Sequence, residues 1–441
     1  MKKIYSSLVC ALAIFASPVW AAEEDVVKAK IEAERVAAEV KLEELFSEVT
    51  KNPEDLELNF KYAQLASKLG KFDEAIAAYE RMLIVNPNLN RVKLDMALVY
   101  MKSGSYGQAK GLFEEVMSKD PPQTVKDNIN SLMTVVRKAE KKHHFNGSMT
   151  FGFNSDSNAS ATPATGAVDL FGVSVPLDDS SRAASDDHRF LSVAGTHTYI
   201  LPSKKRHIWK TDGTIYKTHQ SSIGSLDLTV FSLKTGPTFN IPKIRSKLGF
   251  SAGYSDTHLA RRSYLETISE NMKLEHFMTP KLTVNLSWAH ENRRFKNSPS
   301  ATTYELRNGH ANEQKFGATI SLSKTDIITT GLTLRQEMTK TKYNDNRQES
   351  FNISHTHLFP DDYFLNTSAT IKRTHYKGID VLVNPSTIRS DLERNINFVL
   401  GKKLSPQLTG SVSYQWRNID SSIQNYKYKN ERVGANLSYS F

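Results

Sequence analysis

Residues 432–441 have the sequence RVGANLSYSF, and their pattern indicates the fold of the larger part of the molecule. From Val433 to Phe441 every second residue is apolar, whereas the residues between them are glycine, asparagine or serine. Successive side chains of a β-strand point to opposite faces, so strict alternation predicts a strand with one apolar and one polar face. Aromatic residues near one end of the apolar face fit a strand that separates lipid from water.

The same alternation recurs in the segments before this one. Threonine, asparagine, serine, glycine and lysine separate the apolar residues. A water-soluble sheet of this length would need a thicker apolar core, which argues against a soluble all-β domain and favours a transmembrane antiparallel β-barrel. The apolar faces are Leu282, Val284, Leu286 and Trp288, then Phe316, Ala318, Ile320 and Leu322, then Leu408, Val412, Tyr414 and Trp416.

Six short turns divide this region at intervals of about 40 residues, which is one hairpin of two strands of about 10 residues plus a longer loop. Six turns separate seven hairpins, so the sequence predicts about fourteen strands with both barrel ends in the periplasm. The turns are residues 201–204, 241–243, 278–281, 323–326, 359–362 and 404–407. The longest loop is expected between Asn154 and His188, and the others near 217–225, 256–263, 291–308, 340–348, 377–390 and 417–430.

Both ends of the sequence carry features of an exported protein. A basic start, the apolar run 8–15 and a small-residue site at Ala21 predict a secretory signal that is cleaved before Ala22. The apolar run is too short for a membrane anchor. The single cysteine lies within the signal, so the mature chain is expected to hold no disulfide and no cysteine nucleophile. Tyr439 and Phe441 on the last strand resemble the signal that the barrel-assembly machinery reads.

The first part of the mature chain has the periodicity of helices. Residues 23–50 contain no glycine or proline and place apolar residues at helical spacing, which predicts an amphipathic helix. Two segments then repeat with a period of 34, which resembles the tetratricopeptide repeat. We expect the matched alanines to let helices approach closely, the glycines to end the first helix of each pair, and the prolines to start the next repeat. The matched pairs are Ala63 and Ala97, Gly70 and Gly104, Phe72 and Tyr106, Ala75 and Ala109, Tyr79 and Phe113, and Pro87 and Pro121. A helix within 128–142 would close the stack.

Charge separates the two parts of the chain. The net charge of residues 22–143 is close to zero, whereas that of residues 144–441 is positive and equals the +10 of the whole sequence. Residues 144–441 also contain all but one of the 13 histidines. We therefore expect an α + β multidomain protein with a signal at 1–21, a periplasmic helical domain at 22–142 and an outer-membrane barrel at 143–441.

The sequence carries no motif of a catalytic site: no nucleophile elbow, no H-E-x-x-H and no phosphate-binding glycine loop. We therefore expect no enzyme activity, no cofactor and no metal. His355 and His357 share a strand face with Phe351, Ile353 and Phe359, which places them in an aromatic interface band rather than at a metal site. The β part has a positive net charge but no basic helix of the kind that binds nucleic acid. Its charge therefore indicates a cationic lumen and contact with lipopolysaccharide phosphates rather than nucleic-acid binding.

The order of signal, repeats and a barrel of about fourteen strands resembles the surface lipoprotein assembly modulator (Slam) family. The resemblance rests on the strand number and on Gly70, Phe72, Ala75, Tyr79 and Pro87 with their second copy. It implies an outer-membrane translocator that helps deliver particular lipoproteins, or secreted nutrient-acquisition proteins such as haem-binding ones, to the cell surface or the medium. Expected partners are the exported client, periplasmic chaperones, the barrel-assembly machinery, and outer-membrane lipid and lipopolysaccharide.

Two other functions stay open. A polysaccharide-export porin also joins such repeats to a barrel, but generally with many more repeats and a larger barrel. A nutrient-uptake porin would explain the barrel but not the repeats. The short helical part leaves the type of client open.

Overall fold

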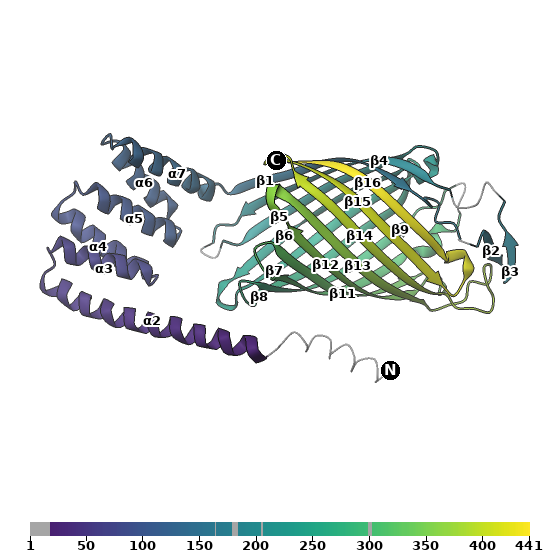
Figure 1. Ribbon diagram of the computed structural model, residues 1–441, viewed down its shortest axis with the longest axis horizontal. Coiled ribbons are helices and arrows are strands. Elements are labelled where there is room, and N and C mark those ends of the chain that lie inside the picture. The colour runs from purple at the N-terminus through teal and green to yellow at the C-terminus, as the bar shows by residue number, and fades with distance from the viewer. Residues whose placement is uncertain (1–17, 164, 179–183, 204–205, 299–301) are drawn as a thin grey trace. The chain divides into compact units, whose positions relative to one another are not determined.

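The computed structural model of the protein describes residues 18–163, 165–178, 184–203, 206–298 and 302–441, with side chains from residue 32 onward (Figure 1). The chain divides into two compact units between Lys141 and Lys142. The first unit is helical and the second contains a closed antiparallel barrel, which confirms the predicted fold class. None of the described helices is long and apolar enough to cross a membrane.

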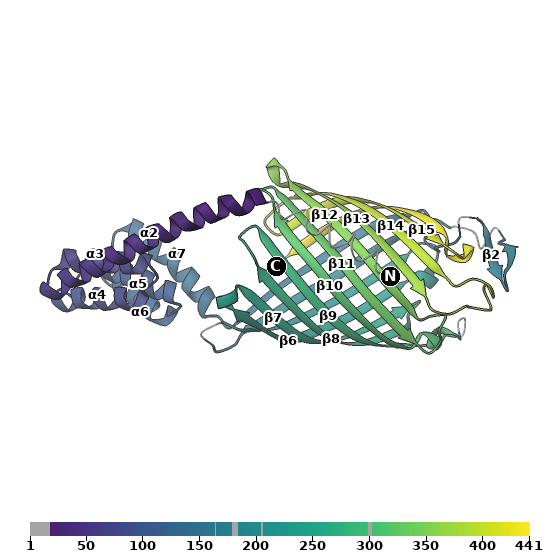
Figure 2. The ribbon, with the colours of Figure 1, turned by 90° about the horizontal axis from the view of Figure 1, so that it is seen from below.

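The helical unit is a stack of antiparallel helix pairs. The helix α3 packs against α4 and α5 against α6, while α2 and α7 pack on the two ends of this stack (Figures 1 and 2). Two repeats flanked by single helices bury two apolar clusters, and Tyr100 and Leu112 pack against both of them. The bounds are α2 (Pro18–Lys51), α3 (Leu56–Lys68), α4 (Phe72–Val85), α5 (Asn90–Ser103), α6 (Tyr106–Met117) and α7 (Gln123–Glu140).

Small residues form the centre of the stack and glycines end its helices. A side chain of one methyl group lets two helix backbones approach, and the four alanines of the repeat are fully buried: Ala63, Ala75, Ala97 and Ala109. Gly70 follows α3 with a φ of +76° and Gly104 caps α5 with a φ of +82°. Glycine reaches this left-handed conformation without strain, so both positions end a helix cleanly.

The closing helix α7 starts at Gln123, earlier than the expected 128. Pro122 occupies its N-cap position with an extended backbone. Proline restricts the residue before it and lacks a backbone donor, so a helix starts readily just after it. The boundary therefore follows the second proline of the Pro121-Pro122 pair rather than the apolar periodicity.

Fourteen of the described strands close into one barrel, in which each strand pairs with its sequence neighbour and β1 pairs with β16 (Figure 1). Each of the six predicted turns lies at or beside a junction of two strands, which is why the strand number could be counted from the sequence. The strands are β1 (His143–Asp156), β4 (Asp186–Ile200), β5 (Ile208–Gln220), β6 (Leu228–Ile241), β7 (Ser246–Leu259), β8 (Arg262–Phe277), β9 (Leu282–Phe295), β10 (Gly309–Ser321), β11 (Asp326–Thr339), β12 (Asn346–Leu358), β13 (Tyr363–Tyr376), β14 (Ser390–Lys403), β15 (Leu408–Ser421) and β16 (Tyr428–Ser440).

The barrel has two different ends. We call the end at which β1 begins, and which carries the six turns, the short-turn end, and the opposite end the long-loop end. Apolar side chains of the predicted faces point outward and are about half exposed in the isolated chain, such as Phe316 at 45%, Val412 at 54% and Val433 at 57%. That exposure is expected of a surface that lipid covers.

The strands are longer than the expected 10 residues: they span 13 to 16. The extra length lies mostly at the long-loop end, so several loops are shorter than predicted. The loop expected at 256–263, for example, is reduced to Ala260 and Arg261, both in the left-handed conformation. Beyond the lipid both faces of a strand meet water, so alternation disappears there although backbone pairing continues.

The loop between β1 and β4 carries a small second sheet at the long-loop end. Its strands β2 (Ala167–Leu170) and β3 (Val173–Pro176) pair only with each other (Figure 1). Backbone hydrogen bonds join Phe171 to Leu382 at 2.9 Å and Gly172 to Val383 at 2.9 Å, which ties this hairpin to the loop 377–389. Its apolar side chains stay exposed, with Phe171 at 66% and Val173 at 64%.

Candidate functional site

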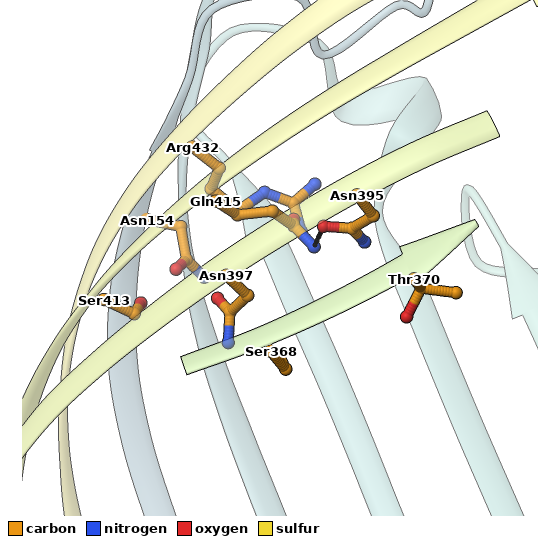
Figure 3. Close-up of a pocket in the computed structure, with 8 residues that line it drawn as sticks. All are labelled: Asn154, Ser368, Thr370, Asn395, Asn397, Ser413, Gln415 and Arg432. Atoms are coloured by element: carbon orange, nitrogen blue, oxygen red, sulfur yellow. Dashed lines mark hydrogen bonds between the residues drawn. The ribbon is translucent and has the colours of Figure 1, made fainter. Parts of the chain in front are cut away.

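The barrel lumen holds a polar pocket of about 340 Å³ on the wall next to the β1–β16 seam (Figure 3). Five strands line it with amides, hydroxyls and one guanidinium, because lumen-facing positions alternate with the lipid-facing ones. Gln415 donates to the Asn395 carbonyl oxygen at 3.2 Å, which orients both amides. The lining residues are Asn154, Ser368, Thr370, Asn395, Asn397, Ser413, Gln415 and Arg432.

A cluster of charges lies on another part of the lumen wall, formed by β9, β10 and β11. Arg335 donates to Glu291 at 2.7 Å, to Glu313 at 3.3 Å and to Glu337 at 3.0 Å. Arg293 also donates to Glu337, at 2.6 Å. The residues come from β9, β10 and β11, which the register brings side by side. Two guanidiniums shared among three carboxylates cross-link these strands.

Smaller ion pairs continue this pattern around the barrel. Glu393 accepts from Arg417 at 2.7 Å and pairs with Lys372 at 2.6 Å. Asp156 accepts from Arg432 at 2.7 Å, which joins the first and last strands of the barrel. These parts of the lumen wall are therefore lined by paired charges and amides, which can both donate hydrogen bonds to a polar molecule and accept them from it.

The helical unit has an open, mostly apolar pocket of about 440 Å³ between the starts of α3 and α5. Leu56, Phe60, Met82 and Leu89 supply its apolar surface. The guanidinium of Arg91 lies 5.5 Å from the ring centroid of Phe60, over one rim of the pocket. Such a pocket fits an apolar side chain of a bound segment, with a cation beside it for a carboxylate or a backbone carbonyl.

The structure places the repeat residues that the sequence singled out at three kinds of position. Tyr79 and Phe113 are buried with the four alanines, Phe72 and Tyr106 are half-buried at the starts of α4 and α6, and the glycines and prolines lie at helix junctions. Tyr439 and Phe441 lie on the outer face at the short-turn end with their ring centroids 6.3 Å apart. Ala21 and Ala22 lie in α2, while residues 1–17 of the expected signal lie outside the described residues.

His355 and His357 lie on the outer face of β12, on the predicted strand face, but they contact a residue that the sequence analysis did not connect with them. Asp326, the first residue of β11, lies directly opposite His357. Its carboxylate receives a hydrogen bond from each imidazole. The turn 323–326 had been identified, but its register against the next hairpin had not, so the sequence alone did not bring the three residues together.

The sequence analysis also did not identify the lumen clusters. Their sequence signal is an acidic residue at an inward position on one strand and a basic residue at or beside the facing position of a strand one or two away. That signal can be used only once the register of neighbouring strands is known.

Comparison with solved structures shows likeness to outer-membrane proteins at low similarity. One is described as a bacterial polysaccharide outer membrane secretin, with a TM-score of 0.34 and 9% identity over 67% of this chain and 98% of that chain. A loop-deletion mutant of OmpT of Vibrio cholerae has a TM-score of 0.39 and 6% identity, over 68% of this chain and 100% of that chain. The Pseudomonas putida toluene transporter TodX has a TM-score of 0.34 and 7% identity, over 67% of this chain and 89% of that chain. No curated protein matches the sequence.

Comparison with protein families is more specific. Residues 66–126 match the tetratricopeptide repeat, which covers most of the stack from α3 to the start of α7. Residues 209–441 match a family described as surface lipoprotein assembly modifier, over barrel strands β5 to β16. Because this second match spans more than half of the chain, the protein with its periplasmic repeats and fourteen-stranded barrel belongs to the surface lipoprotein assembly modifier family.

Proposed function

We propose that the protein is an outer-membrane translocator that delivers one or a few specific clients, lipoproteins or secreted nutrient-acquisition proteins such as haem carriers, to the cell surface or the medium. The family indicates surface lipoprotein assembly, and the protein lies in the outer membrane with its repeat unit in the periplasm. The proposal adds the direct recognition of a client by this chain.

The observation that carries the proposal is the apolar pocket of the helical unit. Leu56 and Phe60 from α3 and Leu89 before α5 expose apolar surface at a place where the stack could have closed it. The Arg91 side chain beside it is 83% exposed, although its Nε lies 4.0 Å from Asp95 Oδ2, so its guanidinium can still be reached by an incoming group. An ion or sugar channel has no use for such a pocket, whereas a client held unfolded by a chaperone presents apolar side chains along an extended backbone.

The lumen suits the passage of an extended chain. Amide and hydroxyl groups, such as those of Asn395, Asn397 and Ser413, can donate to and accept from a peptide backbone without selecting its sequence. The neighbouring charges are paired, so they offer no single strong site at which a chain would stop. Folding of the client outside would then give the direction of transport without a nucleotide.

The experiment compares surface and medium proteins among cells with the wild-type protein, a full deletion, a deletion of residues 22–142 and the single variant Phe60→Asp. We expect the last three to lose the same client, since a carboxylate in the pocket repels apolar side chains. Ile84→Asp is the matched control, because it introduces the same carboxylate at an apolar residue of α4 that is 81% exposed and does not line the pocket.

The folded state of each variant is checked by the helical circular dichroism of the repeat unit and by the amount of barrel in the outer membrane. Loss of a polysaccharide or of small-molecule uptake, with no change in any exported protein, would contradict the proposal and favour a porin.

A further inference from the structure

We infer that Asp326, His355 and His357 form a binding site for a divalent transition-metal ion on the outer face of the barrel at its short-turn end. This site is independent of client transport. The three ligand atoms, one from each residue, lie within 4.8 Å of one another.

The strand geometry brings the three side chains together. His355 and His357 are two residues apart on β12, so both side chains point to the same face. Asp326 faces His357 across the β11–β12 ladder, and His355 is the diagonal neighbour. The Oδ1 atom of Asp326 lies 2.7 Å from His357 Nδ1 and 3.0 Å from His355 Nε2. One carboxylate oxygen thus sits between two imidazole nitrogens.

The carboxylate is held in place by the turn before β11. Its second oxygen, Oδ2, accepts hydrogen bonds from Ser323 Oγ at 2.8 Å and Thr325 Oγ1 at 2.9 Å. The backbone N–H of Asp326 donates to Ser323 Oγ at 3.0 Å, which closes the turn. Oδ1 is therefore left for the imidazoles. A carboxylate ligand oriented by hydroxyl groups is the usual support of a protein metal site.

The donor set selects the class of ion. Two imidazole nitrogens and one carboxylate oxygen suit Zn²⁺, Ni²⁺ or Cu²⁺ rather than Ca²⁺ or Mg²⁺, which prefer all-oxygen sites. Bonds of about 2.1 Å to a tetrahedral ion separate ligand atoms by about 3.4 Å, so the Oδ1–nitrogen distances of 2.7 and 3.0 Å would each open by less than about 1 Å. Three protein ligands leave the fourth position to water or to another molecule.

A bound ion would fasten two neighbouring turns at the periplasmic mouth of the barrel. Asp326 follows the turn between β10 and β11, and His357 precedes the turn between β12 and β13. The Phe359 ring packs edge-on against His357 with centroids 4.4 Å apart, which limits the rotation of the imidazole.

The test is titration of the purified full-length protein, without a histidine tag, with Zn²⁺ alone, measured by competition with a chromophoric chelator. We expect one ion per chain, with affinity reduced at least about 100-fold in His355→Gln/His357→Gln and by about 10-fold or more in Ser323→Ala. His290→Gln is the matched control, because His290 is an outward histidine on β9 whose neighbours Asn312, Trp288 and His310 include none of the three proposed ligands. It should bind as the wild type does.

Three outcomes would overturn the inference: no binding by the wild type, equal binding by the double histidine variant, or an equal loss in His290→Gln. Barrel folding is checked by the heat-dependent gel migration of each variant. Asp326→Asn serves as a second variant that keeps the size of the side chain, and unchanged affinity in it would also exclude the site.

Discussion

At the scale of single residues, two tyrosines of the helical unit link its stability to pH. Burial, reinforced by the hydrogen bond to Glu74, raises the pKa of Tyr62 to about 12, and burial with the nearby Asp95 raises the pKa of Tyr79 to about 12. A folded-state pKa above the ordinary value of 10.0 means that the fold favours the neutral phenol. This stabilisation is complete below pH 10 and is lost as the pH rises through 12.

We therefore expect the fragment 22–142 to lose helical circular dichroism between pH 10 and 12, together with the rise of phenolate absorbance. The double variant Tyr62→Phe/Tyr79→Phe cannot ionise at these positions and should unfold at a higher pH. An unchanged midpoint in the double variant would show that other groups control alkaline unfolding.

At the scale of elements, two glycines in one repeat should respond in opposite directions to the same substitution. Gly104 ends α5 with a φ of +82°, whereas Gly111 lies inside α6, and an added Cβ meets nothing within 4 Å at either position. Both positions have room for a methyl group, so the two glycines differ only in backbone conformation. Gly104→Ala should destabilise the fragment 22–142 by about 1 kcal/mol, and Gly111→Ala should stabilise it by up to about 1 kcal/mol. Urea unfolding measures both, and a shift of the same sign in both would refute the helix-end role of Gly104.

The elements also show what could be predicted from the sequence. The helix pairs followed from residues matched at a fixed period, and the strand number followed from turns rich in proline, lysine and aspartate. The outer ends of the strands did not follow, because outward positions there carry polar residues, such as Asn292 on β9 and Gln336 on β11, and the alternation ends. The group of Asp326, His355 and His357 depends on the register of β11 against β12, which turn geometry sets and composition does not reveal.

At the scale of the whole molecule, the closure of the barrel depends on the contact of β1 with β16. Gly147 and Phe441 exchange backbone hydrogen bonds of 2.8 and 3.0 Å, which form the last pair of this seam at the short-turn end. Removal of Phe441 eliminates both bonds and the aromatic side chain, so we expect less folded barrel in the outer membrane while the helical unit stays folded.

Phe239→Ala is the control for this deletion, because it removes an outward aromatic side chain near the same end of β6 without touching the seam. The measurement is the fraction of heat-modifiable protein in membrane extracts. An equal yield from the deletion and the wild type would show that the seam closes without Phe441.

The hairpin of β2 and β3 affects how an antibody or a phage recognises the long-loop end of the barrel. Two backbone bonds to the loop 377–389, and the hydrogen bonds of Asp169 with Asn425 and Gln424, fix a segment that would otherwise be a long free loop. An antibody or a phage that reaches this end of the barrel therefore meets one shape built from three loops distant in sequence. Exchange of residues in any one of those loops would alter the whole epitope. Few substitutions in these three loops would therefore suffice to escape recognition.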